Sequence, residues 1–104
     1  MNNYIIVTTL CDKEGIKDRI INTLLEKKLV AGAQTSKVYS KYFWNSKLEE
    51  CEEYKIEFRT KESLFEEIEK EIKEIHDYEV CEITYRKIDG ASSEITKWID
   101  ENTK

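Results

Sequence analysis

The sequence predicts an α+β domain in which helices cover one face of a four-stranded antiparallel sheet. Three observations indicate this class. Its 104 residues suffice for one domain with a buried core, and residues 1–104 are assigned to it. Strand-like and helix-like segments follow in the order strand, helix, strand, strand, helix, strand, helix. The two consecutive strands in the middle of this order read as one long hairpin.

The N-terminal segments read as an inner strand followed by an amphipathic helix. Residues 4–10 are apolar or β-branched without polar alternation, which is typical of a strand buried within a sheet. Asp12 suits the N-cap of the helix that follows. The buried stripe of this helix is predicted to be Ile16, Ile20, Ile21, Leu24 and Leu25.

A long hairpin is predicted around a two-residue turn at Asn45-Ser46. Strands of about 12 residues on each side exceed the usual five or six, so the hairpin should project beyond the core. The projection carries four aromatic residues: Tyr39, Tyr42, Phe43 and Trp44. Because aromatic surface of this size is seldom left in water, we interpret the hairpin as an oligomerisation arm. The alternative is that these aromatics cover the protein's own helices.

The C-terminal half is predicted to add a helix, a strand and a last helix. Thr60 or Ser63 begins the first helix, which has apolar residues at helical spacing: Leu64, Phe65, Ile68, Ile72 and Ile75. The fourth strand contains Val80, Ile83 and residues 85–88, and Asp89-Gly90 turns the chain into the last helix. This order is that of a ferredoxin-like βαββαβ sandwich with an extra C-terminal helix, and its first and third strands should be central.

Composition and charge argue against several classes of function. With 17 basic and 22 acidic side chains, the net charge of −5 disfavours a nucleic-acid partner. The apolar runs are too short to cross a membrane and the N-terminal residues are unlike a signal peptide, so we expect a cytoplasmic protein. Three cysteines without a close pair fit reduced thiols. No nucleophile elbow, Walker loop or zinc-protease motif is present, and we expect no enzyme.

Candidate ligand chemistry is densest in residues 75–83, between the second helix and the fourth strand. They include His76, which is the only histidine. Its imidazole has two interpretations: it satisfies carbonyls at the helix C-terminus, or it binds copper or zinc. A metal site would need further donors, for which Cys81, Glu79 or Glu82, Cys11, or groups of another subunit are candidates.

The candidate thiols and glutamates, and also Arg59, have other interpretations. Cys11 and Cys81 lie at strand ends, where each can instead be a buried inert thiol. Glu79 and Glu82 should face opposite sides if the strand is regular from Glu79. Arg59 is a candidate anion contact or a surface charge pair.

With these segments in view, the sequence resembles the CutA family of divalent-cation tolerance proteins. The resemblance covers nearly the whole chain and includes a final Trp98-Ile99. Its most specific element is His76-Asp77-Tyr78-Glu79-Val80-Cys81-Glu82-Ile83. The other matching segments are Ile5-Ile6-Val7-Thr8-Thr9 with Asp12-Lys13-Glu14, Leu29-Val30-Ala31, Val38-Tyr39-Ser40 to Trp44 with Lys47-Leu48-Glu49-Glu50, and Phe58-Arg59-Thr60.

The resemblance implies a ferredoxin-like subunit that forms a homotrimer through the hairpin, with clefts between subunits. It implies that His76 binds metal and that five residues surround the cleft: Trp44, Lys47, Tyr78, Glu79 and Glu82. Arg59 stands where the family usually has lysine. The family has proline where this chain has Cys11, Asp77 and Cys81, so the two thiols either add metal ligands or relax two turns.

Two functions follow as hypotheses. The first is a cytoplasmic homotrimeric protein of divalent-cation tolerance that binds copper or another divalent metal. The alternative is a regulator similar to the trimeric PII signalling proteins, whose cleft binds a small anionic ligand or whose hairpin contacts a partner protein. An acylphosphatase-like enzyme is not expected, because residues 10–14 lack its glycine-rich phosphate loop.

Overall fold

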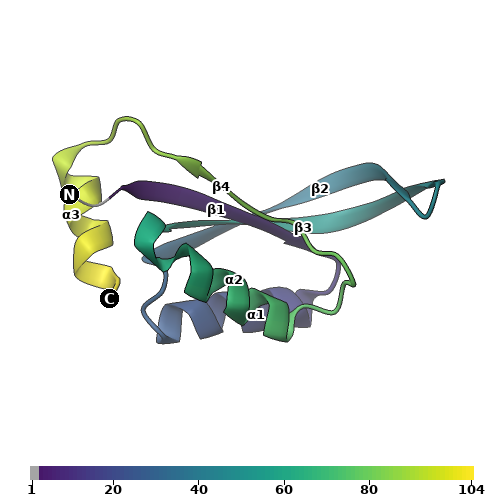
Figure 1. Ribbon diagram of the computed structural model, residues 1–104, viewed down its shortest axis with the longest axis horizontal. Coiled ribbons are helices and arrows are strands. Elements are labelled where there is room, and N and C mark those ends of the chain that lie inside the picture. Colours follow the sequence, from purple (N-terminus) through teal and green to yellow (C-terminus); the bar gives the residue numbers. More distant parts are fainter. Residues whose placement is uncertain (1–2) are drawn as a thin grey trace.

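A four-stranded antiparallel sheet organises the chain, with two helices on one face and a third beside one end (Figure 1). The computed structural model describes residues 3–104. The elements in chain order are β1 (Tyr4–Cys11), α1 (Glu14–Glu26), β2 (Gly32–Trp44), β3 (Lys47–Lys61), α2 (Phe65–Ile75), β4 (Ile83–Lys87) and α3 (Ser93–Asn102). The strand order β2-β3-β1-β4 confirms that the first and third strands are central.

The core lies between the sheet and helices α1 and α2. Alternate residues of β1 and β3 point toward the helices, because successive side chains of a strand face opposite sides. From the sheet, Ile5, Val7, Ile56 and Phe58 are fully buried. From the helices, the buried side chains are Ile20, Leu24, Ile68 and Ile72, which confirms the predicted helical stripes.

The predicted arm is present. Tyr54 is the last β3 residue paired with β1, opposite Cys11. Beyond this point residues 38–44 and 47–53 pair with each other, and the hairpin projects from the body (Figure 1). Its turn has positive φ at Asn45 (52°) and Ser46 (64°), as a type I′ turn requires. We call residues 38–53 the arm.

Helix α1 does not begin with the predicted cap. Its N-cap residue is Lys13, which makes no side-chain cap hydrogen bond. The Asp12 carboxylate lies 3.4 Å from the Lys13 ammonium instead. Asp12 is therefore engaged in an exposed charge contact and does not cap α1.

The predicted start of the second helix was also wrong in part. Thr60 belongs to β3, because β3 stays paired with β1 as far as Lys61 opposite Tyr4. Ser63 lies in a short 3₁₀ turn, Glu62–Leu64, which leads into α2. The apolar spacing thus located the helix but not its first residue.

The fourth strand begins at Ile83, later than predicted. Residues 76–82, which we call the junction, are irregular, and Val80 within them is exposed. Pairing of β4 with β1 stops at Ile83 opposite Thr9. The next carbonyl of β1, that of Leu10, accepts a hydrogen bond from the His76 ring and is therefore not available to extend the pairing with β4.

Helix α3 packs near the opposite end of the sheet from the arm (Figure 1). Ser92 caps it by accepting a hydrogen bond from the Ile95 N–H at 3.3 Å. The Trp98 ring reaches the backbone of Gly32, where a Cβ atom would lie 2.8 Å from the ring. No helix in residues 3–104 is long and apolar enough to cross a membrane.

Two buried threonines on neighbouring central strands offer a matched test of the core. The Thr60 hydroxyl donates to the Leu29 carbonyl at 2.5 Å, whereas that of Thr9 has no hydrogen-bond partner within residues 3–104. We expect Thr60→Val to lower the free energy of unfolding by about 1–3 kcal/mol, because the Leu29 carbonyl loses its donor. Thr9→Val should leave it unchanged or raise it. Urea denaturation at equal protein concentration measures both, and equal losses would contradict the difference.

Candidate functional site

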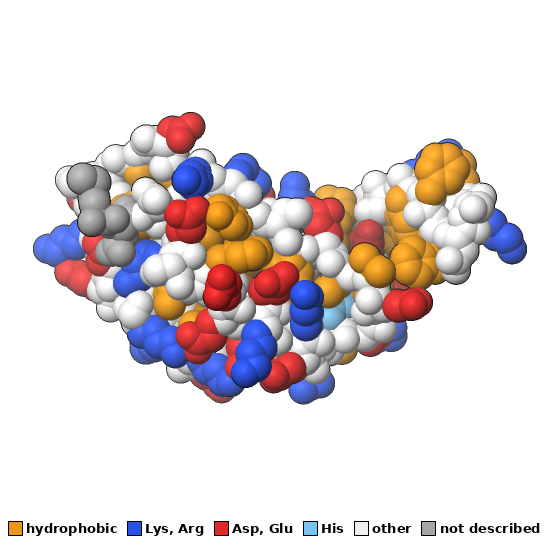
Figure 2. Space-filling model, in the orientation of Figure 1, with side chains coloured by type: hydrophobic (Ala, Val, Ile, Leu, Met, Phe, Trp, Pro, Cys, Tyr) orange, Lys and Arg blue, Asp and Glu red, His pale blue; other side chains and the backbone are white. Residues whose placement is uncertain are grey.

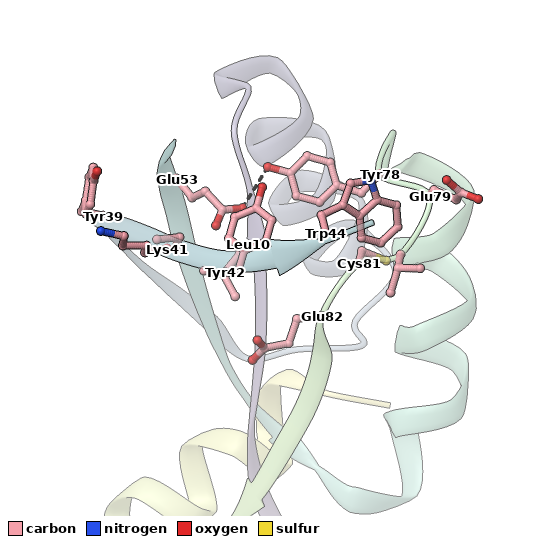
Figure 3. Close-up of a pocket in the computed structure, with 12 residues that line it drawn as sticks. Leu10, Tyr39, Lys41, Tyr42, Trp44, Glu53, Tyr78, Glu79, Cys81 and Glu82 are labelled. Carbon is pink, nitrogen blue, oxygen red and sulfur yellow. Dashed lines mark hydrogen bonds between the residues drawn. The ribbon is translucent and has the colours of Figure 1, made fainter. Parts of the chain in front are cut away.

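A cleft of about 820 Å³ separates the arm from the junction (Figure 3). One wall is the hairpin and the other is the segment that follows α2. The cleft combines aromatic rings with carboxylates. Its lining residues are Leu10, Tyr39, Ser40, Lys41, Tyr42, Trp44, Glu53, Tyr78, Glu79, Val80, Cys81 and Glu82.

The His76 ring fixes the junction to the end of β1. Its side chain is only 1% exposed. Nδ1 accepts a hydrogen bond from the Tyr78 N–H at 3.1 Å, so Nδ1 carries no proton. Nε2 therefore donates to the Leu10 carbonyl at 2.6 Å, and the imidazole is neutral. One interpretation of the sequence expected the ring to bond the terminal carbonyls of its own helix. It bonds a carbonyl of β1 instead.

Tyr78 ties the junction to the base of the arm. Its hydroxyl donates to Glu53 Oε2 at 2.8 Å (Figure 3). The Tyr78 and His76 rings are in contact, with centroids 4.6 Å apart. Burial, together with the neighbouring Glu53 carboxylate, raises the pKa of Tyr78 far above its usual value. Tyr78 is thus a permanent hydrogen-bond donor to a carboxylate that is itself only 7% exposed.

A surface ion pair holds the other side of the junction. The Lys13 ammonium lies 2.6 Å from an Asp77 carboxylate oxygen, which connects the junction to the start of α1. The hydrogen bond from Lys13 holds the pKa of Asp77 below its usual range. The junction is therefore attached to β1, the arm and the start of α1 by polar side chains, although it has no regular secondary structure.

The two candidate thiol ligands lie in different surroundings. Cys11 is fully buried, and its thiol donates to the Lys13 carbonyl at 3.7 Å. Burial raises the pKa of Cys11 to about 11, so this thiol is protonated at neutral pH. Cys81 lines the cleft, and burial raises its pKa as well. Cys11, Cys51 and Cys81 are all free thiols.

Charged groups make the cleft acidic. Glu79 and Glu82 both line it, although a regular strand would have placed them on opposite sides; the junction is irregular, so the alternation does not apply. Lys41 also lines the cleft, but its ammonium pairs with Glu50 at 3.1 Å. This balance of charge does not favour a small anionic ligand.

Lys47 and Arg59 do not line the cleft of the single chain, and their place at a cleft between subunits stays a prediction. Lys47 lies beside the turn at the tip of the arm, opposite Trp44. Arg59 lies in the body of the sheet, opposite Gly32 and Ile6. Conversely, Glu53 lines the cleft and was not identified from the sequence. Its one sequence signal is that it ends an acidic run immediately before the alternating part of β3.

Residues 3–104 do not form a complete metal centre by themselves. Within residues 3–104, no group of three or more histidine, cysteine, aspartate or glutamate side chains is arranged to hold a metal ion. Both nitrogens of His76 are hydrogen-bonded, and Cys11 is buried. Glu79, Cys81 and Glu82 are the candidate donors that line the cleft. Any ion bound here would need further ligands from water or a second chain.

Two tyrosine hydroxyls test the link between arm and junction. Tyr78→Phe removes the donor to the buried Glu53, and we expect it to lower the free energy of unfolding by about 1–3 kcal/mol. Tyr85→Phe removes a similar bond to Glu62, an exposed one at 2.7 Å, and should have a smaller effect. Urea titrations at equal protein concentration compare the variants. A larger loss for Tyr85→Phe would show that Glu53 does not depend on Tyr78.

Known proteins match this chain over almost its whole length. The model of the family described as CutA1 divalent ion tolerance protein matches residues 4–102. The divalent-cation tolerance protein CutA of Pyrococcus horikoshii is 35% identical over 100 residues, covering 96% of this chain and 97% of the relative. The divalent-cation tolerance protein CutA of Archaeoglobus fulgidus is 32% identical over 104 residues, covering 100% of this chain and 100% of the relative.

Solved structures agree with the sequence relatives. The crystal structure of CutA1 from Ehrlichia chaffeensis has a TM-score of 0.92 at 28% identity, covering 100% of this chain and 98% of that one. CutA1 from Pyrococcus horikoshii has a TM-score of 0.91 at 33% identity, covering 96% and 98%. These matches confirm the ferredoxin-like fold predicted from the order of the elements, and they confirm the resemblance to the CutA family. The chain belongs to the CutA1 family of divalent ion tolerance proteins.

Proposed function

We propose that this protein acts in divalent-cation tolerance as a non-enzymatic, cytoplasmic homotrimer that binds a divalent metal ion such as copper or zinc. The observation that carries the proposal is that Glu79, Cys81 and Glu82 all line one acidic cleft. A thiolate beside carboxylates suits borderline metals of this kind. Membership of a family described by divalent ion tolerance supports the same class of ligand.

Cys81 and Glu79 are the proposed principal donors from one chain. Because burial raises the pKa of Cys81, metal binding there must release a proton. His76 joins the site only if one ring nitrogen leaves its present partner, Leu10 or Tyr78. Cys11 would have to turn from its buried position. Further donors are expected from water or from a neighbouring subunit, whose arm would border the same cleft together with Trp44 and Tyr78.

The exposed face of the arm supports the homotrimer. Tyr39 and Phe43 are 64% and 78% exposed and, with Leu48, lie on one face of the hairpin, on either side of the Lys41–Glu50 ion pair. Figure 2 shows hydrophobic side chains on this projection, on the right of the view. They do not cover the protein's own helices, which was the alternative considered from the sequence. A second subunit is the proposed cover for this apolar area.

The cytoplasmic location rests on the three free thiols, which fit a reducing compartment. Related proteins carry names that refer to other compartments. The Archaeoglobus fulgidus structure is named as periplasmic and a rice relative as chloroplastic. Location is therefore proposed for this chain from its own cysteines and not from its relatives.

Metal titration tests the proposed ligands. We expect the metal-stripped, reduced protein to bind copper or zinc, and expect Cys81→Ser and Glu79→Gln each to weaken binding by more than about tenfold. Affinity should rise by up to about tenfold per pH unit near neutrality, because the raised pKa of Cys81 requires proton release. Cys81→Ser should flatten this rise. Isothermal titration at several pH values measures both effects.

Two further variants sharpen the metal titration. Cys51→Ser removes a thiol that does not line the cleft and serves as the matched control. His76→Ala tests whether the imidazole leaves its hydrogen bonds to join the site. Binding that is equal in the wild type, Cys81→Ser and Glu79→Gln would refute the metal site at this cleft.

Light scattering tests the arm as the trimer interface. We expect Phe43→Ser to reduce the solution mass from that of a trimer to that of a monomer at micromolar concentration, because it removes the most exposed of the arm's aromatic side chains. Glu49→Ser, an exposed arm residue of the opposite face, should leave the mass unchanged. If Phe43→Ser remains fully trimeric, the subunits associate through another surface.

A further inference from the structure

The base of the cleft contains a carboxylate that is only partly satisfied. Glu53 is 93% buried in a wall of the cleft. Its Oε2 accepts the Tyr78 hydroxyl, while Oε1 is not among the fully buried atoms that lack a partner within residues 3–104. A buried carboxylate is costly unless its charge is compensated. This oxygen therefore offers a strong hydrogen-bond acceptor to a cationic ligand that enters the cleft.

Aromatic rings form much of the remaining surface of the cleft. Trp44 and Tyr42 project from the arm, and Tyr78 from the junction (Figure 3). Trp44 and Tyr42 are both partly exposed, so a ligand has access to their rings. Aromatic faces attract organic cations, and tryptophan does so most strongly. The apolar rings also suit the methylene chain that joins such cations.

We propose that this cleft binds a linear polyamine. Its anionic groups are distributed and not clustered: Glu53 lies at the arm side, and Glu79 and Glu82 lie on the junction (Figure 3). A chain of ammonium groups separated by methylenes matches carboxylates separated by aromatic surface. A cleft of about 820 Å³ is large enough for such a ligand. The Lys41 ammonium is neutralised by Glu50 and so opposes a cation only weakly.

This ligand is distinct from the metal ion of the proposed function. Metal binding relies on the Cys81 thiolate and Glu79. Polyamine binding shares Glu79 and Glu82 but depends in addition on a second pair, Glu53 and the Trp44 ring. Neither residue of the second pair is required for metal coordination. The two proposals therefore fail separately when the experiments use metal-free protein for one and amine-free buffer for the other.

Titration calorimetry with spermidine tests the inference on the intact, metal-stripped protein at low ionic strength. We expect binding by the wild type and a loss of about tenfold or more in Glu53→Gln, which keeps the shape of the side chain and an acceptor for Tyr78. Trp44→Leu should weaken binding by about 2- to 30-fold, as a lost cation–π contact predicts. Thermal denaturation of each variant without ligand establishes that it is folded.

The matched control is Glu52→Gln, which removes the same charge from the neighbouring, exposed position outside the cleft. Its affinity for spermidine should equal that of the wild type. Equal losses in Glu52→Gln and Glu53→Gln would reveal general attraction to an acidic protein and overturn the inference. No binding by the wild type would also overturn it, as would tighter binding of a trilysine peptide, which would identify a peptide as the occupant.

Discussion

The arrangement of the site depends on one imidazole placed between two backbone groups. His76 follows α2, and its neutral ring donates to the Leu10 carbonyl at the end of β1 while accepting the N–H of Tyr78. The first bond uses the Leu10 carbonyl, which would otherwise be the next to pair with β4. The junction therefore stays irregular. The Tyr78 hydroxyl then reaches Glu53, so that the junction and the arm face each other across a cleft. A single buried side chain thereby links the end of β1, the junction and the base of the arm.

The length of the hairpin has the second largest consequence. β1 ends at Cys11, opposite Tyr54, but β2 and β3 continue as a pair with no further strand beside them. One face of this arm carries Tyr39 and Phe43 toward solvent. The other carries Tyr42 and Trp44 toward the junction. Tyr39 also lines the cleft, so the surface suited to association and the surface that lines the cleft meet along β2.

Several features were predictable because they depend on local pattern. Each of three features is determined by residues that lie close together in the chain. They are the apolar run of residues 4–10, the helical spacing of Ile68 and Ile72, and the Asn45-Ser46 turn. The boundaries that failed depend on distant partners instead. Thr60 stays in β3 because β1 pairs with it, and Val80 is excluded from β4 because His76 occupies the end of β1. Glu53 was not predicted as a cleft residue because its neighbours in the sequence do not distinguish it from the acidic residues before it.

The sequence by itself determined the order of the elements, the projecting arm and, through the segment from His76 to Ile83, the family. These follow from side-chain periodicity and from residues adjacent in the chain. Only the tertiary structure decided that His76 is neutral with both nitrogens engaged, that Lys47 and Arg59 do not line the cleft of the single chain, and that Glu53 lies in its wall. The physical reason is that protonation, burial and net charge at a site are set by groups brought together from β1, the arm and the junction, which are up to 66 residues apart in the chain.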